Sequence, residues 1–270
     1  MITDRCSHQN LNLGEKPLTD EVEKRLINAL LQSMLRPETL VEHVEAGPKF
    51  IAVTAGGRMG LASLLGARPK EDETHLAEEL VGRSLSQVAA LLSEASPFRI
   101  SLGLAAFNAS NTPKAADIIA ADTPAEELIT ELGRGKTVGL VGDFPFVSTL
   151  REQVGTFHLF ELQDVPGAVP RDQWDKTLAG LDVLALTGTA LLTRQMGYFL
   201  KQAAQAKTVV LGPSTPLSQA LFDFGADYLC TSVVTEPERV AQGISAGLSF
   251  RMIKKNGGIM FVNLTKDEKS

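Results

Sequence analysis

The first regular pattern along the chain is a helical one. Apolar residues recur at three- and four-residue steps from Val22 to Leu35, which predicts an amphipathic helix. Thr19 or Asp20 can cap its start, and Pro37 ends it. Three short runs of strand character follow, at 40–45, 50–55 and 58–62, separated by a turn at 46–48 and by the pair Gly56-Gly57. This pattern predicts a helix followed by a three-stranded antiparallel meander.

Helical patterns return after a charged loop at 63–75. Short helices are expected at 76–80 and 85–92, and Ser96-Pro97 is typical of a helix start with proline in the first turn. Gly103 lies inside this last helix, where glycine costs about 1 kcal/mol relative to alanine, so we expect it to allow close packing against the sheet. Strands and helices that segregate in this way indicate an α+β layer pair.

The second part of the chain alternates between strands and helices. Residues 110–123 are small and polar and are expected to be a linker, and Pro124 opens a helix that runs through Leu132. Short apolar runs predict strands at 136–142, 156–162, 181–187, 208–212 and 228–232, with helices at 146–153, 191–205, 217–224 and 236–247. This alternation favours an α/β fold with a parallel sheet covered on both faces. A last run at 258–264 is expected to be an edge strand.

Composition narrows the class of protein. The 270 residues, 44% of them hydrophobic, allow one large domain or two small ones. The net charge of −6 gives no basic surplus, so no nucleic-acid partner is expected. No apolar run is long enough for a bilayer, so no membrane partner is expected either. Only Cys6 and Cys230 are present, which fits a reducing compartment and a cytoplasmic protein; the sequence leaves open whether it forms a homo-oligomer.

Polar residues follow several of the predicted strands, at the edge where open α/β sheets bind ligands. The first group is Gly142, Asp143, Phe144 and Pro145. It is neither a dinucleotide fingerprint nor a P-loop, and Asp143 would place a negative charge where a pyrophosphate should lie. The alternative interpretation is a strand-to-helix turn in which Asp143 helps to cap the helix.

Two further groups follow later strands. Hydroxyl groups flank a glycine at Thr187, Gly188 and Thr189, and could hold a polar ligand or cap the next helix. A rigid, proline-bounded loop contains Gly212, Pro213, Ser214 and Thr215. Such a loop suits recognition of a small ligand, although turn residues also cluster for geometric reasons alone.

Glu161 completes the set of candidates. It ends the second predicted strand, 19 positions after Gly142, near the spacing at which an acid binds ribose hydroxyls in nucleotide and methyl-donor folds. Asp143 and Glu161 are the candidate general acid or base if the protein is an enzyme; otherwise both are solvated carboxylates. The four histidines are scattered, and the sequence has no zinc-binding motif and no G-x-S-x-G.

Together these motifs carry a resemblance. The segments K-T-V-G-L-V-G-D-F-P (136–145), T-G-T (187–189) and G-P-S-T-P-L (212–217), with Glu161, resemble the putative heavy-metal chelation family. L-V-G-R-S-L (80–85) and S-L-G-L-A-A-F-N-A (101–109) are similar to the small domain that usually precedes it. The resemblance implies an α+β domain like the N-terminal domain of enolase at 18–112 and a Rossmann-like domain at 122–266.

The resemblance also implies a ligand cleft between the two domains, to which Asn108 would contribute. Our first hypothesis is a protein that binds a small molecule or a metal chelate, because three predicted strands end in polar, glycine-containing segments without a recognisable nucleophile. The second is an enzyme that condenses or hydrolyses a pterin-, flavin- or siderophore-like metabolite. A third is a nucleotide or methyl-donor site that uses Glu161. The bound group is expected to be a transition-metal ion or a pterin- or flavin-like ligand.

Overall fold

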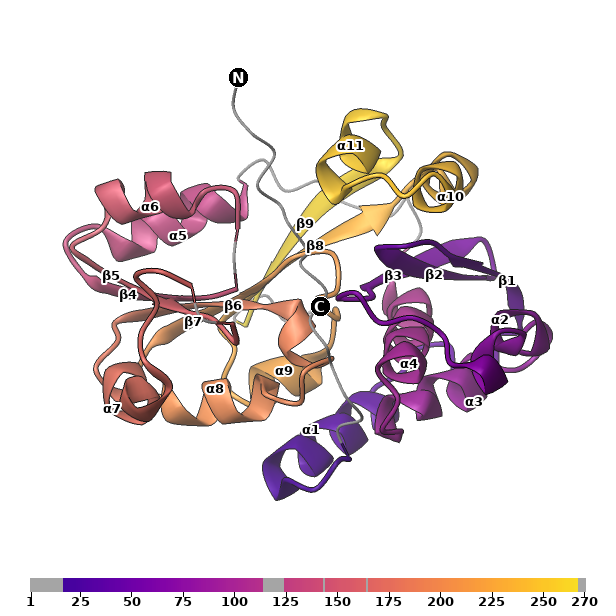
Figure 1. Ribbon diagram of the computed structural model, residues 1–270, viewed down its shortest axis with the longest axis horizontal. Coiled ribbons are helices and arrows are strands. Elements are labelled where there is room, and N and C mark those ends of the chain that lie inside the picture. Colours follow the sequence, from indigo (N-terminus) through magenta and orange to yellow (C-terminus); the bar gives the residue numbers. More distant parts are fainter. Residues whose placement is uncertain (1–16, 114–123, 143, 164, 267–270) are drawn as a thin grey trace.

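The protein is a mixed α/β molecule with two sheets. The computed structural model describes residues 17–113, 124–142, 144–163 and 165–266. Residues 17–113, here called the N-terminal half, contain a three-stranded antiparallel sheet, and residues 124–266, the C-terminal half, contain a mostly parallel six-stranded sheet. The two sheets lie side by side, with helices on their faces (Figure 1). Within the described ranges, every helix is too short or too polar to cross a membrane.

The first helix, α1, spans Glu21–Gln32. Asp20 caps it as predicted, because its carboxylate accepts hydrogen bonds from the Val22 and Glu23 backbone N–H groups at 2.8 and 3.0 Å. The helix ends before Pro37 and buries the apolar stripe that includes Leu26, Ile27 and Leu30.

The predicted meander is confirmed. Strands β1 (Val41–Ala46), β2 (Phe50–Ala55) and β3 (Arg58–Ser63) pair antiparallel in this order. Gly56 and Gly57 both have positive φ values, 56° and 68°, which is the backbone conformation that the two-residue hairpin requires.

Four helical segments follow: α2 (Leu76–Glu79), α3 (Leu85–Ala89), the 3₁₀ helix η2 (Ala90–Ser93) and α4 (Pro97–Asn111). Pro97 opens α4 as predicted, although the Ser96 side chain makes no capping hydrogen bond. Our prediction for Gly103 was right about close packing and wrong about the partner. A Cβ there would lie 2.4 Å from the backbone nitrogen of Leu92, so α4 packs at this point on η2 and not on the sheet.

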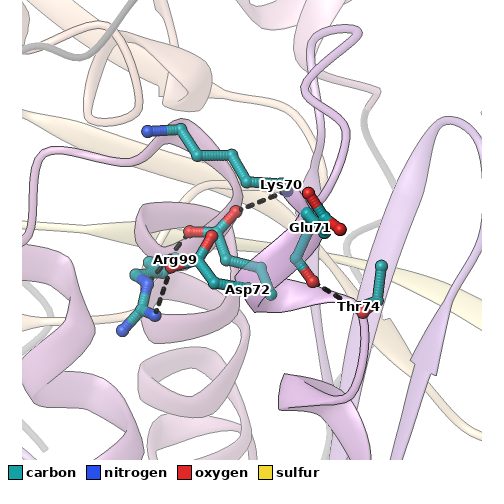
Figure 2. Close-up of polar contacts among 6 residues, drawn as sticks. Lys70, Glu71, Asp72, Thr74 and Arg99 are labelled. Carbon is teal, nitrogen blue, oxygen red and sulfur yellow. Dashed lines mark hydrogen bonds and ion pairs between the residues drawn. The ribbon is translucent and has the colours of Figure 1, made fainter.

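The loop between β3 and α2 is held to α4 by a buried carboxylate. Glu73, in the 3₁₀ helix η1 (Glu71–Glu73), is 2% exposed, and its side chain accepts hydrogen bonds from the Lys70 N–H at 3.0 Å and from Arg99 Nε at 2.9 Å. Figure 2 labels the two residues that donate these bonds, Lys70 and Arg99. Burial alone would raise the pKa of Glu73. The hydrogen bonds from Lys70, Ser96 and Arg99 outweigh burial and hold this pKa below its ordinary value.

Glu73 should therefore stabilise the fold in a pH-dependent way. We expect Glu73→Gln to lower the free energy of unfolding at pH 7 by about 2 kcal/mol, since it removes hydrogen bonds to a charged group. A lowered pKa means that this contribution is present above pH 4.5, the ordinary value, and is lost as the pH falls through the folded-state value. Urea unfolding at pH 7, 5 and 3.5 checks this, with the exposed Glu71→Gln as control. A difference that did not shrink in acid would contradict the assignment.

The C-terminal half alternates strands and helices much as predicted. Its elements are α5 (Ala125–Gly133), β4 (Thr137–Val141), α6 (Val147–Gln153), β5 (Thr156–Phe160), η4 (Arg171–Gln173), α7 (Trp174–Ala179), β6 (Val183–Thr187), η5 (Gly188–Ala190), α8 (Met196–Gln202), β7 (Lys207–Leu211), α9 (Gln219–Asp223), β8 (Tyr228–Val234), α10 (Pro237–Ser245), α11 (Phe250–Lys255) and β9 (Ile259–Thr265). The helix predicted at 191–205 begins only at Met196, because Arg194 adopts a left-handed conformation with φ 58°. The predicted linker is partly helical, since Ser110 and Asn111 end α4; residues 114–123 lie outside the described ranges.

The strand order is β5-β4-β6-β7-β8-β9, with β4 to β8 parallel and β9 antiparallel at the edge. The direction in which successive strands are added to the sheet reverses at β4, because β5 lies on one side of β4 and all later strands lie on the other side. Helices α5 and α6 cover one face, and α7, α8 and α9 cover the other (Figure 1). A point of reversal in a parallel sheet is where ligands bind in this class of fold.

Apolar side chains of the two halves pack against each other. Phe50, Ala52 and Met59 on the three-stranded sheet pack in one cluster with Val240 and Ile244 of α10, so this sheet lies between α4 and the C-terminal half. Helix α1 in turn packs on α8 and α9. A single buried cluster contains apolar residues from both halves.

Candidate functional site

The ends of β4, β6 and β7 lie next to one another, as expected of neighbouring parallel strands. Gly142, with φ 102°, directly follows β4, and a Cβ there would lie 3.2 Å from the Thr187 side chain at the end of β6. A Cβ at Gly188 would lie 2.6 Å from both the backbone nitrogen and Oγ1 of Thr215, in the loop after β7. Three of the segments singled out in the sequence are therefore in contact at one edge of the sheet.

The Thr187–Thr189 segment makes its own local hydrogen bonds. The two hydroxyl groups are 2.9 Å apart, and Thr187 Oγ1 also accepts from the Thr189 N–H at 3.3 Å. Thr187 is the N-cap of η5, so the capping role that we held as the alternative is present.

The loop after β7 connects the two halves. Ser214 is 1% exposed, and its Oγ accepts a hydrogen bond from the Ser63 N–H of β3 at 2.9 Å. The Thr215 N–H donates to the Gly212 carbonyl, and the Thr231 hydroxyl of β8 donates to the Thr215 carbonyl at 2.9 Å. This loop is fixed from both sides, with Pro213 between its bonded ends.

Asn108 reaches the same loop from the N-terminal half. Its Nδ2 donates to the Leu61 carbonyl at 2.8 Å, and the residue lines a small cavity of about 10 Å³. The cavity is lined from both halves, by Met59, Leu61, Asn108 and Thr112 and by Pro213, Thr215, Leu217, Thr231 and Ser232. This volume is at the lower limit for one water molecule.

Three side-chain oxygens of this cavity are unpartnered. Asn108 Oδ1, Thr215 Oγ1 and Ser232 Oγ are buried and have no hydrogen-bond partner among the described residues. A buried polar atom without a partner costs about 1–3 kcal/mol. Asn108 Oδ1 can only accept a hydrogen bond, whereas the two hydroxyl groups can donate or accept.

The remaining candidates lie at the margin of this site. Phe144 stacks on Phe146 with ring centroids 5.2 Å apart, and a Cβ at Gly142 would lie 3.4 Å from its ring. Pro145 is exposed beside it, and Asp143 lies outside the described residues. Glu161 follows β5, on the outer side of β4, and its Oε2 accepts from the N–H of the next residue, Leu162, at 2.8 Å.

Of the lining residues that sequence reasoning missed, two carry neighbouring hydroxyl groups, Thr231 and Ser232. Both lie in β8, in a run that we interpreted simply as an apolar strand. Their signal was two consecutive hydroxyl side chains inside that run, one of them on each face of the strand.

The donor chemistry does not fit a bare heavy-metal ion. In the part of the chain that the structure describes, no group of three or more His, Cys, Asp or Glu side chains could hold a metal. Cys230 is buried, and desolvation raises the pKa of its thiol to about 12, which disfavours the thiolate that binds metals. Soft metals select thiolate and imidazole ligands, whereas this site offers neutral hydroxyl and amide oxygens.

Comparison with known proteins identifies the family. A family model described as "Putative heavy-metal chelation" matches residues 125–263, and a second model with the same description matches residues 27–111. Among curated proteins, none matches the chain. A crystal structure from Desulfitobacterium hafniense, of a protein of unknown function, is 23% identical with a TM-score of 0.80, covering 90% of this chain and 98% of that one. Another from Pyrococcus horikoshii, also of unknown function, is 18% identical with a TM-score of 0.68, covering 90% and 99%.

Proposed function

Since the chain belongs to the family described as putative heavy-metal chelation, we propose that it binds a metal already held by an organic chelator, at the junction of its two halves. The metal would be ligated by the chelator, and the protein would hydrogen-bond the organic part. The observation that carries the proposal is that three residues lining one cavity, Asn108, Thr215 and Ser232, each carry a buried side-chain oxygen without a hydrogen-bond partner in the described part of the chain.

The chemistry of these oxygens favours a class of ligand. Asn108 Oδ1 accepts hydrogen bonds, and the two hydroxyl groups can donate or accept. An ammonium group, which siderophore-like chelators can carry, has three N–H donors and would satisfy all three oxygens, whereas a single secondary amide N–H would satisfy one of them. Because the cavity holds about 10 Å³, only one such group would enter it, while the rest of the ligand would lie along Gly142, Thr187–Thr189 and Gly212–Thr215.

The binding hypothesis is better supported than the enzymatic one. Of the two carboxylates that an enzyme would use, Asp143 lies outside the described residues, and Glu161 follows β5, which the sheet order separates from β7 by two strands.

Calorimetric titration tests the proposal with two probes, Zn²⁺ alone and ferric ion held by a hydroxamate chelator. We expect the ferric complex to bind and Zn²⁺ to bind much more weakly, since the cavity offers no soft ligand. Thr215→Val should reduce affinity for the complex roughly tenfold, the equivalent of one hydrogen bond. It should not lower the melting temperature, because the Oγ1 that it removes has no partner.

Thr130→Val serves as the matched control, because it makes the same substitution on α5, a helix that does not line the cavity. This variant should bind the ferric complex like the wild type. Equal affinity of Thr215→Val and wild type for the ferric complex would place the ligand elsewhere. Binding of Zn²⁺ alone as tight as that of the complex would overturn the claim that the chelator is needed.

A further inference from the structure

A second group of polar contacts joins the two halves. It lies where the segment between β6 and α8 meets the start of α8. Glu23, in the first turn of α1, is 1% exposed, and its Oε1 accepts a hydrogen bond of 2.6 Å from the Gly197 N–H at the start of α8. Arg194 reaches the other way, and its Nη2 donates to the Glu94 carbonyl of the N-terminal half at 2.6 Å. The 194–197 segment of the C-terminal half is therefore bonded twice to the N-terminal half, once through Arg194 and once through Gly197.

The junction contains opposite charges that are not directly paired. Glu23 Oε2 and Arg194 Nε and Nη1 are buried and have no hydrogen-bond partner among the described residues. Glu23 is buried and Arg194 is half-buried, and a buried charge without a direct partner is costly, so this arrangement favours removal of one of the two charges. Only Glu23 can lose its charge by taking up a proton at accessible pH.

The charged neighbours of Glu23 are few. Burial is the largest influence on the Glu23 pKa and raises it to about 7. Hydrogen bonds from the Gly197 and Tyr198 backbone N–H groups and the charge of Arg194 lower this pKa, and the charge of Asp20 raises it. Of the elements that pack on α1, α8 carries Tyr198, whose hydroxyl donates to Asp175, and the exposed Lys201. Glu94 follows η2 and Asp223 ends α9, and both are exposed.

We propose that Glu23 and Arg194 form a proton-controlled latch between the two halves. In the protonated state, the neutral Glu23 caps the Gly197 N–H, and Arg194 keeps its left-handed backbone. Loss of the proton creates a buried carboxylate, and the Arg194 guanidinium then moves to pair with it. Arg194 directly follows the segment 187–193, so this movement is transmitted to Thr187 and Thr189. A left-handed non-glycine residue stores strain of the kind found at switch regions.

Backbone amide NMR between pH 5.5 and 8.5, without any added ligand, tests the latch. The Gly197 amide resonance should shift with a midpoint near pH 7, together with the Arg194 Nε–H and the Thr189 amide. A direct readout that needs no variant is the carboxyl carbon shift of Glu23, which should show the same midpoint. A wild type in which Glu23 titrates near pH 4.5 would overturn the proposal.

Variants separate the latch from a merely structural contact. Glu23→Gln should abolish the shared transition, whereas the exposed Glu21→Gln in the same helical turn should leave it unchanged. Arg194→Met should move the Gly197 midpoint to higher pH, since the cation favours the charged carboxylate, and should remove the Thr189 shift. A Thr189 amide that stays fixed while Gly197 titrates in the wild type would overturn the coupling. None of these readouts depends on the proposed ligand.

Discussion

Replacing Gly60 by alanine should cost at least about 3 kcal/mol of folding free energy, above the usual range for added volume in a core. Gly60 lies on β3 where α4 crosses the sheet, and a Cβ there would lie 2.1 Å from the Ala109 nitrogen and 2.2 Å from the Ala105 carbonyl oxygen. Both atoms belong to the backbone of a buried helix, so no side-chain rotation can make room. Helix and sheet would have to separate along a buried contact.

Chemical denaturation measures this effect, with Gly180→Ala as the matched control. At Gly180 the nearest atom to an added Cβ is 3.7 Å away, and φ is −99°, so we expect a change within about 0.5 kcal/mol. If Gly60→Ala were as stable as the control variant, the close approach of α4 to β3 would be wrong.

Gly188→Ala should impair stability and ligand binding together. The added Cβ would lie 2.6 Å from the Thr215 nitrogen and 2.8 Å from the Ser214 carbonyl carbon, which would push the loop after β7 away from β6. That movement would break the buried bond between Ser214 Oγ and the Ser63 N–H and would displace Thr215 Oγ1 from the cavity. We expect a loss of about 3 kcal/mol in stability and of more than tenfold in affinity for the ferric hydroxamate complex.

Urea unfolding and calorimetric titration at a temperature where the variant stays folded provide the two measurements. Gly180→Ala again supplies the comparison, since it adds the same methyl group away from the site. Reduced stability with unchanged affinity would make the contact between these loops purely structural and would count against a ligand beside Thr215.

Local chemistry made much of the fold predictable. The Gly56-Gly57 hairpin follows from the backbone freedom of glycine, and Pro97 opens α4 because its fixed φ suits the first turn. The apolar runs of the parallel strands are recognisable because both faces of that sheet are covered. The direction of β9 was not predictable, since a single edge strand of either polarity has the same pattern.

The tertiary contacts of single polar residues were not predictable. Glu23 in the first turn of a helix is typical of a solvated charge that favours the helix dipole, and only the packing of α1 on α8 buries it. Arg194 interrupts a helical pattern without a glycine or proline to mark the break. Gly103 shows the same limit, because a glycine signals a close approach without identifying the neighbour.

The position of α1 has a consequence for how such a chain can evolve. This helix comes before the three-stranded sheet in the sequence, yet it packs on α8 and α9 of the six-stranded sheet's helix layer. Recombination that joined either half to an unrelated domain would expose the apolar surface that α1, α8 and α9 now bury against one another. The two halves are therefore expected to be inherited together, as a pair whose contacting surfaces change in step.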